Sequence, residues 1–320
     1  MHETLADFSL GRSIQPRGMI QKVGVIGCGA VGQEITRAIS QYGIDIVFLD
    51  LDEDRIKLIF SQIEDQLDDV INHWGLTPGE KRAILSRIKG TTDYNDLADC
   101  DIVIESISSR KRGTSIEERK EIFKKVEAVV REDAIISSNI ATLMISDLAA
   151  VLQHPERAIG IHFILPVHKS RMIEVVKGIS SSDESYQQVI KFAGMINKKI
   201  VRVNESPGNI VTRMLVTTIN EACEILMEGV ASVSDIDTAM KESSGNIYGP
   251  FEMADRIGLD KILKYMDNLY QEFGDKKYKP SPIIKRLVRA NYYGRITNRG
   301  FYNYESGKSV DQTVTCAVIK

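Results

Sequence analysis

A glycine-rich segment between two apolar runs most constrains the fold of this chain. The motif Gly-x-Gly-x-x-Gly occupies residues 27–32, directly after an apolar run at 22–26. An amphipathic stretch follows, and a second apolar run covers residues 45–49. This order predicts a strand, a tight turn, a helix and a second strand, which together form the βαβ unit of a parallel sheet.

Each glycine of the motif has its own physical reason. Gly27 permits the tight turn, Gly29 lets a pyrophosphate approach the backbone, and Gly32 allows the helix to pack closely on the strand. The second run ends in Asp50, whose carboxylate would accept hydrogen bonds from an adenosine ribose. The helix N-terminus faces the anion. We therefore predict a nicotinamide dinucleotide site that consists of Gly27, Gly29, Ala30, Val31, Gly32 and Asp50.

The cofactor expected at this site is NAD. Asp50 would repel a 2′-phosphate and no arginine directly follows it, so NAD is favoured over NADP. Arg55 is the nearest basic residue that would weaken this preference. The alternative interpretation is that the glycines serve only a turn and that Asp50 is a solvated strand end. The position of the motif between two apolar strands favours the dinucleotide site.

Further strands and a helical hairpin extend this unit. A polar, helix-favouring region from 53 to 89 is broken by Gly75 and by Thr77-Pro78, where a threonine N-cap precedes proline at the first helical position. Beyond it, helical patterns alternate with short apolar runs at 102–104, 134–136, 158–161 and 200–203. This alternation predicts an α/β fold with an N-terminal Rossmann-like doubly wound sheet, mostly parallel, and an inserted helical hairpin.

Helical periodicity dominates the chain after a loop at 204–208. The 320 residues also exceed the usual size of one hydrophobic core, so two domains are expected. We place an NAD-binding Rossmann domain at residues 1–203 and an all-helical C-terminal domain at residues 204–320.

A histidine and a glutamate lie on successive apolar runs in the middle of the chain. His162 is near the end of one run, and Glu174 lies within the next. Hydride transfer from an alcohol needs a group that removes the hydroxyl proton, and a histidine oriented by a carboxylate suits this task near neutral pH. A lone histidine at a strand end is usually a structural hydrogen-bonding residue. The pair on a Rossmann sheet favours a catalytic site.

Together these motifs resemble the 3-hydroxyacyl-CoA dehydrogenase family over residues 22–304. The resemblance rests on the glycine-rich turn with Asp50, Glu105, Ser138-Asn139, His162 twelve residues before Glu174, Pro207-Gly208, Asn220-Glu221-Ala222, Gly249-Pro250-Phe251 and Gly300-Phe301-Tyr302. It implies an NAD-dependent oxidoreductase that interconverts a 3-hydroxyacyl thioester and the 3-ketoacyl thioester.

The resemblance also implies roles for single residues. His162 is the general acid/base, and Glu174 orients it. Glu105, Ser138 and Asn139 fall on the cofactor side of the site. The helical hairpin is the part that contacts coenzyme A, and the helical domain is the part that forms a homodimer.

Several active-site positions depart from the family pattern. A serine that usually contacts the reacting oxygen is replaced by Ala141, and two asparagines are replaced by Leu165 and Thr212. One donor aimed at a developing oxyanion is worth roughly 2.7 to 4 kcal/mol, so we expect a slower reaction with the usual substrate. Thr142 and Thr212 keep hydroxyl groups that would compensate in part, and both are candidate substrate contacts.

Three functions remain open from the residues alone. The first is oxidation and reduction of an acyl thioester of coenzyme A. The second is the same chemistry on a carrier-protein thioester or on a free hydroxy acid, bound through Arg110, Arg112 or Arg171. The third is a catalytically weak NAD-binding protein, although the retention of His162 and Glu174 argues against it.

Composition bears on partners and location. With 41 basic and 44 acidic residues, the charge indicates no nucleic-acid partner. No apolar stretch approaches the roughly 20 residues that cross a membrane, and the first 20 residues lack the pattern of a signal peptide. The four cysteines lack metal-ligand spacing and favour free thiols in a reducing cytosol. We therefore expect no metal, no membrane partner and a cytoplasmic location.

Overall fold

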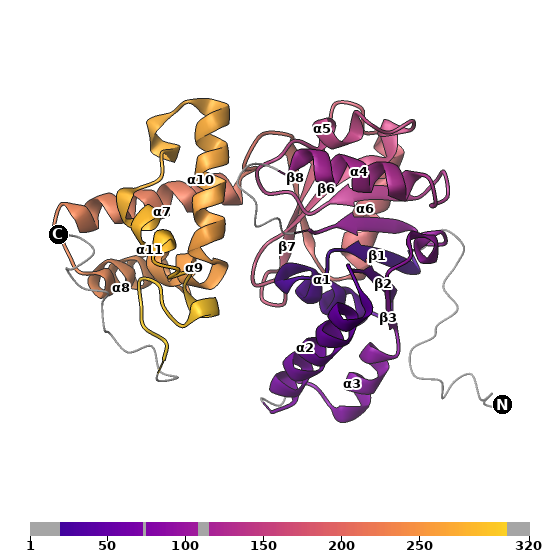
Figure 1. The fold of residues 1–320 in the computed structure, drawn as a ribbon, viewed down its shortest axis with the longest axis horizontal. Coiled ribbons are helices and arrows are strands. Elements are labelled where there is room, and N and C mark those ends of the chain that lie inside the picture. Colours follow the sequence, from indigo (N-terminus) through magenta and orange to yellow (C-terminus); the bar gives the residue numbers. More distant parts are fainter. Residues whose placement is uncertain (1–19, 73–74, 108–114, 306–320) are drawn as a thin grey trace. The chain divides into compact units, whose positions relative to one another are not determined.

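The computed structural model describes residues 20–72, 75–107 and 115–305. The described residues fall into two compact units, the first ending at Glu205 and the second beginning at Ser206. The first unit is an α/β domain and the second is helical (Figure 1). Expectations that involve the first 19 residues, Arg110, Arg112 or Cys316 concern positions outside these ranges.

An eight-stranded sheet forms the centre of the first unit. The strand order is β3-β2-β1-β4-β5-β6-β7-β8, and neighbours are parallel except for the antiparallel pair β6 and β7. The strands are β1 (Lys22–Ile26), β2 (Asp45–Leu49), β3 (Ile88–Thr91), β4 (Ile102–Glu105), β5 (Ile135–Ser138), β6 (Ala158–Phe163), β7 (Met172–Lys177) and β8 (Lys199–Asn204). The predicted doubly wound sheet is confirmed.

Helices cover both faces of this sheet, which is why its strands are nearly continuous apolar runs. One buried core joins the sheet to α1 (Ala30–Ser40), α2 (Glu53–Asn72) and α6 (Asp183–Met195). A second core joins the opposite face to α4 (Ile116–Glu127) and α5 (Ile145–Ala149). Because helices cover both faces of the sheet, a site is expected at the ends of its parallel strands.

The predicted helical hairpin consists of α2 and α3 (Pro78–Leu85), which extend from the sheet on the side of β2 and β3 (Figure 1). Thr77 caps α3 as expected. Its hydroxyl oxygen accepts the Glu80 N–H at 3.2 Å, and the Glu80 carboxylate accepts the Thr77 N–H at 2.8 Å. This reciprocal capping box fixes the start of the helix.

One boundary of the predicted hairpin was wrong. The helix-favouring region was extended to Lys89, whereas Ile88 and Lys89 are the first residues of β3. The segment pairs in parallel with β2, from Ile46 opposite Ile88 to Leu49 opposite Thr91. Backbone pairing with a neighbouring strand outweighs the weak local preference of a short polar segment.

The second unit contains five α-helices among its described residues. They are α7 (Val211–Met227), α8 (Val233–Ser244), α9 (Pro250–Ile257), α10 (Leu259–Phe273) and α11 (Pro282–Arg289). They enclose a third apolar core. The carboxylate of Asp255 accepts the N–H groups of Phe301 and Tyr302, and so ties the last described segment to α9. Burial raises the pKa of Asp255 to about 6.

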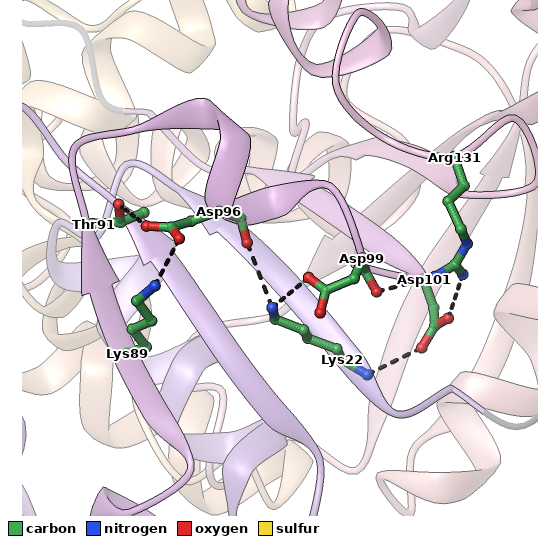
Figure 2. A network of polar contacts seen from close by, with 7 residues as sticks. All are labelled: Lys22, Lys89, Thr91, Asp96, Asp99, Asp101 and Arg131. Carbon is green, nitrogen blue, oxygen red and sulfur yellow. Dashed lines mark hydrogen bonds and ion pairs between the residues drawn. The ribbon is translucent and has the colours of Figure 1, made fainter.

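A polar network lies at the amino ends of β1 and β4 (Figure 2). The Lys22 ammonium contacts Asp99, and the Lys22 backbone N–H donates to Asp101 at 3.0 Å. Arg131 donates to the other oxygen of Asp101 at 2.7 Å. Asp99 and Arg131 are largely exposed. The network therefore ties strand ends together at the surface, on the edge opposite the glycine-rich turn.

Within the described residues, no helix is both long and apolar enough to cross a membrane.

Candidate active site

The glycine-rich turn lies at the carboxyl end of β1, where the strand order reverses between β1 and β4. Gly27 has a φ of +84°, and a Cβ there would lie 2.8 Å from Ile107. A Cβ on Gly32 would lie 2.3 Å from the Gly27 carbonyl oxygen, whereas one on Gly29 would meet no atom within 4 Å. Two glycines thus serve the turn and the helix contact, and the third faces open space.

The first turn of α1 has the properties of an anion site. The helix begins at Ala30, directly after Gly29, with no acidic residue in its first turn and no side-chain cap. The first N–H groups of a helix have no partner within it, and the helix dipole adds partial positive charge there. Ala30, Val31 and Gly32 therefore fit the pyrophosphate of a dinucleotide.

Asp50 lies beside this turn, directly after β2. Its carboxylate accepts the Cys28 N–H and the Leu51 N–H, each at 2.9 Å. Only 9% of its side chain is exposed. These contacts fix the carboxylate at the edge where a doubly wound sheet binds the adenosine ribose.

A buried ion pair lies at the carboxyl ends of β4 and β5. Glu105 pairs with Arg119 of α4 and accepts the Ser138 hydroxyl at 2.5 Å. Its other oxygen accepts the Ile107 N–H at 2.6 Å. Sequence reasoning missed Arg119, because it lies on a charge-rich helix whose pattern does not reveal which cation turns inward. Glu105, Ser138 and Arg119 form one polar group beside the glycine-rich turn.

Asn139 connects this group to the next strand. Its backbone N–H donates to the Glu105 carbonyl at 2.7 Å, and its side-chain oxygen accepts the Phe163 N–H at 2.9 Å. Phe163 directly follows His162 in β6. The predicted cofactor-side residues and the predicted proton-transfer residue are therefore joined through one side chain.

His162 and Glu174 lie directly opposite each other in the antiparallel pair β6 and β7. The His162 Nδ1 is 2.7 Å from a Glu174 carboxylate oxygen, and the Glu174 side chain is fully buried. Because the carboxylate holds Nδ1, the Nε2 atom is the one that can exchange a proton with a ligand. The geometry is that of a histidine base with an orienting carboxylate.

Two sequence models of one family match nearly the whole chain. The 3-hydroxyacyl-CoA dehydrogenase NAD binding domain matches residues 22–206, and the C-terminal domain of the same family matches residues 208–304. The chain belongs to the 3-hydroxyacyl-CoA dehydrogenase family.

Individual relatives span the same length. The 3-hydroxybutyryl-CoA dehydrogenase of Bradyrhizobium diazoefficiens is 38% identical over 292 residues, which cover 91% of this chain and 98% of that protein. A crystal structure of (S)-3-hydroxybutyryl-CoA dehydrogenase from Ralstonia eutropha is 37% identical, with a TM-score of 0.79, and covers 89% of this chain and 99% of that chain. The structure of FadB2 from M. tuberculosis has a TM-score of 0.85 at 29% identity, with coverage of 89% and 99%.

The positions expected from the sequence to depart from the family pattern lie in both units. Ala141 and the buried Thr142 follow β5, in the loop before α5. Leu165 follows β6 and packs partly buried against the larger core. Thr212 is buried in the first turn of α7, in the second unit. Arg171 is exposed directly before β7.

The loop between β6 and β7 has contacts that sequence reasoning also missed. The Val167 N–H donates to Glu34 of α1 at 2.6 Å, and the Lys198 ammonium donates to the Val167 carbonyl at 2.7 Å. One peptide group on each side of Val167 is thus held by a charged side chain. Nothing in the local pattern of α1 signals this contact, since Glu34 lies 133 residues away in sequence.

Proposed function

We propose that this member of the family is an active NAD-dependent oxidoreductase that interconverts a 3-hydroxyacyl thioester and the 3-ketoacyl thioester. The observation that supports activity most directly is the His162–Glu174 pair, held at 2.7 Å on the sheet that bears the glycine-rich turn. A protein kept only for cofactor binding would have no need of a buried carboxylate behind a histidine.

The roles of the two residues follow from their geometry. NAD bound at this site would supply the acceptor for the hydride that leaves C3 of the hydroxyacyl group. The Nε2 of His162 takes the proton of the 3-hydroxyl as the carbon–oxygen bond becomes a carbonyl, and returns it in the reverse direction. The Glu174 carboxylate holds the imidazole and stabilises the positive charge that forms on it.

We assign cofactor binding to residues of the first unit. Ala30, Val31 and Gly32 would supply N–H groups to the pyrophosphate, and Asp50 would accept hydrogen bonds from the ribose hydroxyls. Glu105, Ser138 and Asn139 shape the adjoining part of the site through the contacts described above. Their buried hydrogen bonds keep that part rigid, which favours a defined position of the reacting ring.

We propose that coenzyme A carries the acyl group as a thioester and binds at the α2–α3 hairpin. The relatives named 3-hydroxybutyryl-CoA dehydrogenase support this choice. A carrier-protein thioester or a free hydroxy acid is the alternative, and the exposed Arg171 is its described candidate contact. Turnover of NADH with acetoacetyl-CoA tests the proposal. A substantial rate supports it. A rate confined to free acids or carrier-bound substrates contradicts coenzyme A as the acyl carrier, but leaves the proposed oxidation and reduction standing.

We propose that Ala141, Leu165 and Thr212 alter the substrate specificity of the enzyme. The double change Ala141→Ser with Thr212→Asn restores donors that act mainly in the transition state. We expect it to raise activity on acetoacetyl-CoA and to lower activity on the native substrate. Steady-state kinetics across a panel of ketoacyl thioesters measures both. A gain without any native activity to lose indicates decayed catalysis, and no gain at all contradicts the assignment of these positions.

The remaining proposals concern organisation. Residues 1–203 are proposed as the NAD-binding domain and 204–320 as the substrate and dimerisation domain. A wide groove lined by α7, residues 276–282 and α11 supports a homodimer, as do two exposed apolar side chains, Ile210 directly before α7 and Met214 within it. Light scattering of the intact chain tests this: Met214→Glu should raise the dimer dissociation constant. A monomeric wild type contradicts it.

A cytoplasmic location is proposed from the chemistry of the thiols. Cys28, Cys100 and Cys223 are free and buried. Free thiols are the usual state in a reducing compartment. Fractionation of cells that express the full chain tests this location.

A further inference from the structure

The cofactor edge contains a cation that no step of the proposed reaction uses. Arg55 lies in the first turn of α2, where its backbone N–H donates to Asp52 at 2.7 Å. Its side chain turns back toward the sheet, with Nε 3.9 Å from a carboxylate oxygen of Asp50. The side chain is 38% exposed, so its guanidinium keeps donors accessible to a ligand.

The charge of Arg55 also acts at the glycine-rich turn. Burial raises the pKa of the Cys28 thiol to about 12, and the charge of Asp50 adds to this shift while the charge of Arg55 opposes it. Both charges therefore act on the turn that receives the dinucleotide. The Asp50 carboxylate accepts hydrogen bonds from the Cys28 and Leu51 N–H groups, which hold it in position beside the turn.

This arrangement presents two opposite charges to the same part of a dinucleotide. NAD and NADP differ only at the adenosine 2′-position, where NADP bears a phosphate of about −1.5 to −2 charges. A carboxylate repels that phosphate and accepts a free hydroxyl, whereas a guanidinium binds phosphate through paired hydrogen bonds. Asp50 and Arg55 therefore pull cofactor choice in opposite directions.

We propose that Arg55 is a second determinant of cofactor choice, which offers its guanidinium to a 2′-phosphate and limits the exclusion of NADP by Asp50. The inference rests on the proposed cofactor site. Wild-type protein still prefers NADH, because the fixed carboxylate is closer to the turn. Arg55 reduces that preference, and removing Asp50 releases Arg55 as a phosphate-binding residue.

The test is a set of equilibrium titrations of the intact chain with NADH and NADPH, followed by nicotinamide fluorescence. Competition with ADP and with adenosine 2′,5′-bisphosphate separates the 2′-phosphate from the rest of the cofactor. The variants are Arg55→Ala, Asp50→Asn, the double variant and Lys57→Ala. Lys57 is a matched control, since it removes one positive charge from the same helix at a side chain that is 75% exposed.

The expected pattern is specific to ligands with a 2′-phosphate. Wild type should bind NADH at least about tenfold more tightly than NADPH. Arg55→Ala should weaken NADPH and the bisphosphate by about tenfold, the size of one charge-assisted hydrogen bond, and leave NADH and ADP nearly unchanged. Asp50→Asn should strengthen NADPH binding, and the double variant should lose that gain. Lys57→Ala should change none of these constants appreciably.

Other outcomes overturn the proposal. Unchanged NADPH affinity in Arg55→Ala, an equal loss for NADH and NADPH, or the same effect from Lys57→Ala each contradicts a 2′-phosphate contact. In those cases intact NADH binding leaves the proposed function standing. Absence of NADH binding in wild type overturns the cofactor site itself, and the present inference with it.

Discussion

The two ends of the sheet in the first unit both bear ion pairs, but the pairs differ in how exposed they are. At the amino ends of β1 and β4, Lys22 meets a 69% exposed Asp99, and Arg131 is 46% exposed (Figure 2). At the carboxyl ends, Glu105 is 1% exposed beside Arg119, and Glu174 is fully buried beside His162. The first set is solvated, and the second is enclosed by protein.

The difference between these pairs shows that burial, rather than the presence of charge, decides how much an ion pair contributes. Exposed ion pairs contribute little, because solvent screens them and long side chains lose freedom. A buried charge is costly when its partner is removed, because nothing replaces the lost interaction. Charges persist at a buried edge only where each has a partner, and there they are available to hold a site in place.

The largest effect is expected where burial and chemistry coincide. Replacing His162 by Ala should lower kcat by roughly 10² to 10⁴, the usual contribution of general acid/base catalysis, and leave NADH affinity nearly intact. Steady-state kinetics on the true substrate, together with NADH titration, measures both. Wild-type turnover of the variant would show that the proton passes through another group.

The next effect concerns stability at the same buried edge. Glu105→Gln leaves Arg119 buried without its charged partner, which should lower the free energy of unfolding by about 3 to 5 kcal/mol. Urea unfolding of wild type and variant measures the change. A loss under about 1 kcal/mol, the range of exposed pairs, would remove the proposed contrast between the two edges.

A smaller effect on catalysis is expected from Glu174→Gln. The base remains, but the amide no longer stabilises the imidazolium, so kcat should fall by about 10²-fold or less, the lower end of the general acid/base range. The profile of kcat against pH distinguishes this from a folding defect. If Glu174→Gln cost more than His162→Ala, the assignment of roles would have to be exchanged.

The smallest effect belongs to the exposed edge. Arg131→Ala should change the free energy of unfolding by no more than about 1 kcal/mol, and high salt should reduce even that difference. Urea unfolding at two salt concentrations provides the comparison with Glu105→Gln. A salt-independent loss as large as that of Glu105→Gln would mean that both edges are equally structural.

The sequence predicted those parts of the molecule whose signal is local. The glycine-rich turn, Asp50 and the threonine cap of α3 each depend on a few adjacent residues, and the structure has them where expected. The sequence pattern places the first residues of β3 in a helix, because a strand of four partly polar residues is too short to show a period. Only pairing with β2 identifies them as a strand.

Arg119 and Glu34, which support the candidate site, could not be predicted from the sequence for a different reason. Arg119 is one of several charged residues on α4, and Glu34 is one of the polar residues on α1. Which of them turns toward a buried partner depends on how the helix packs on the sheet. The pair His162 and Glu174 could be anticipated because the two residues lie on successive apolar runs, which form neighbouring strands of one sheet.

The antiparallel step between β6 and β7 separates the chemistry from the loop that joins the two strands. His162 and Glu174 are cross-strand neighbours, so backbone hydrogen bonds of the sheet set their spacing. The connection at 164–171, which includes Leu165, lies outside both strands. Loops tolerate changes of sequence and length better than the elements they connect. Changes in the length or sequence of this loop can therefore leave the spacing of His162 and Glu174 intact.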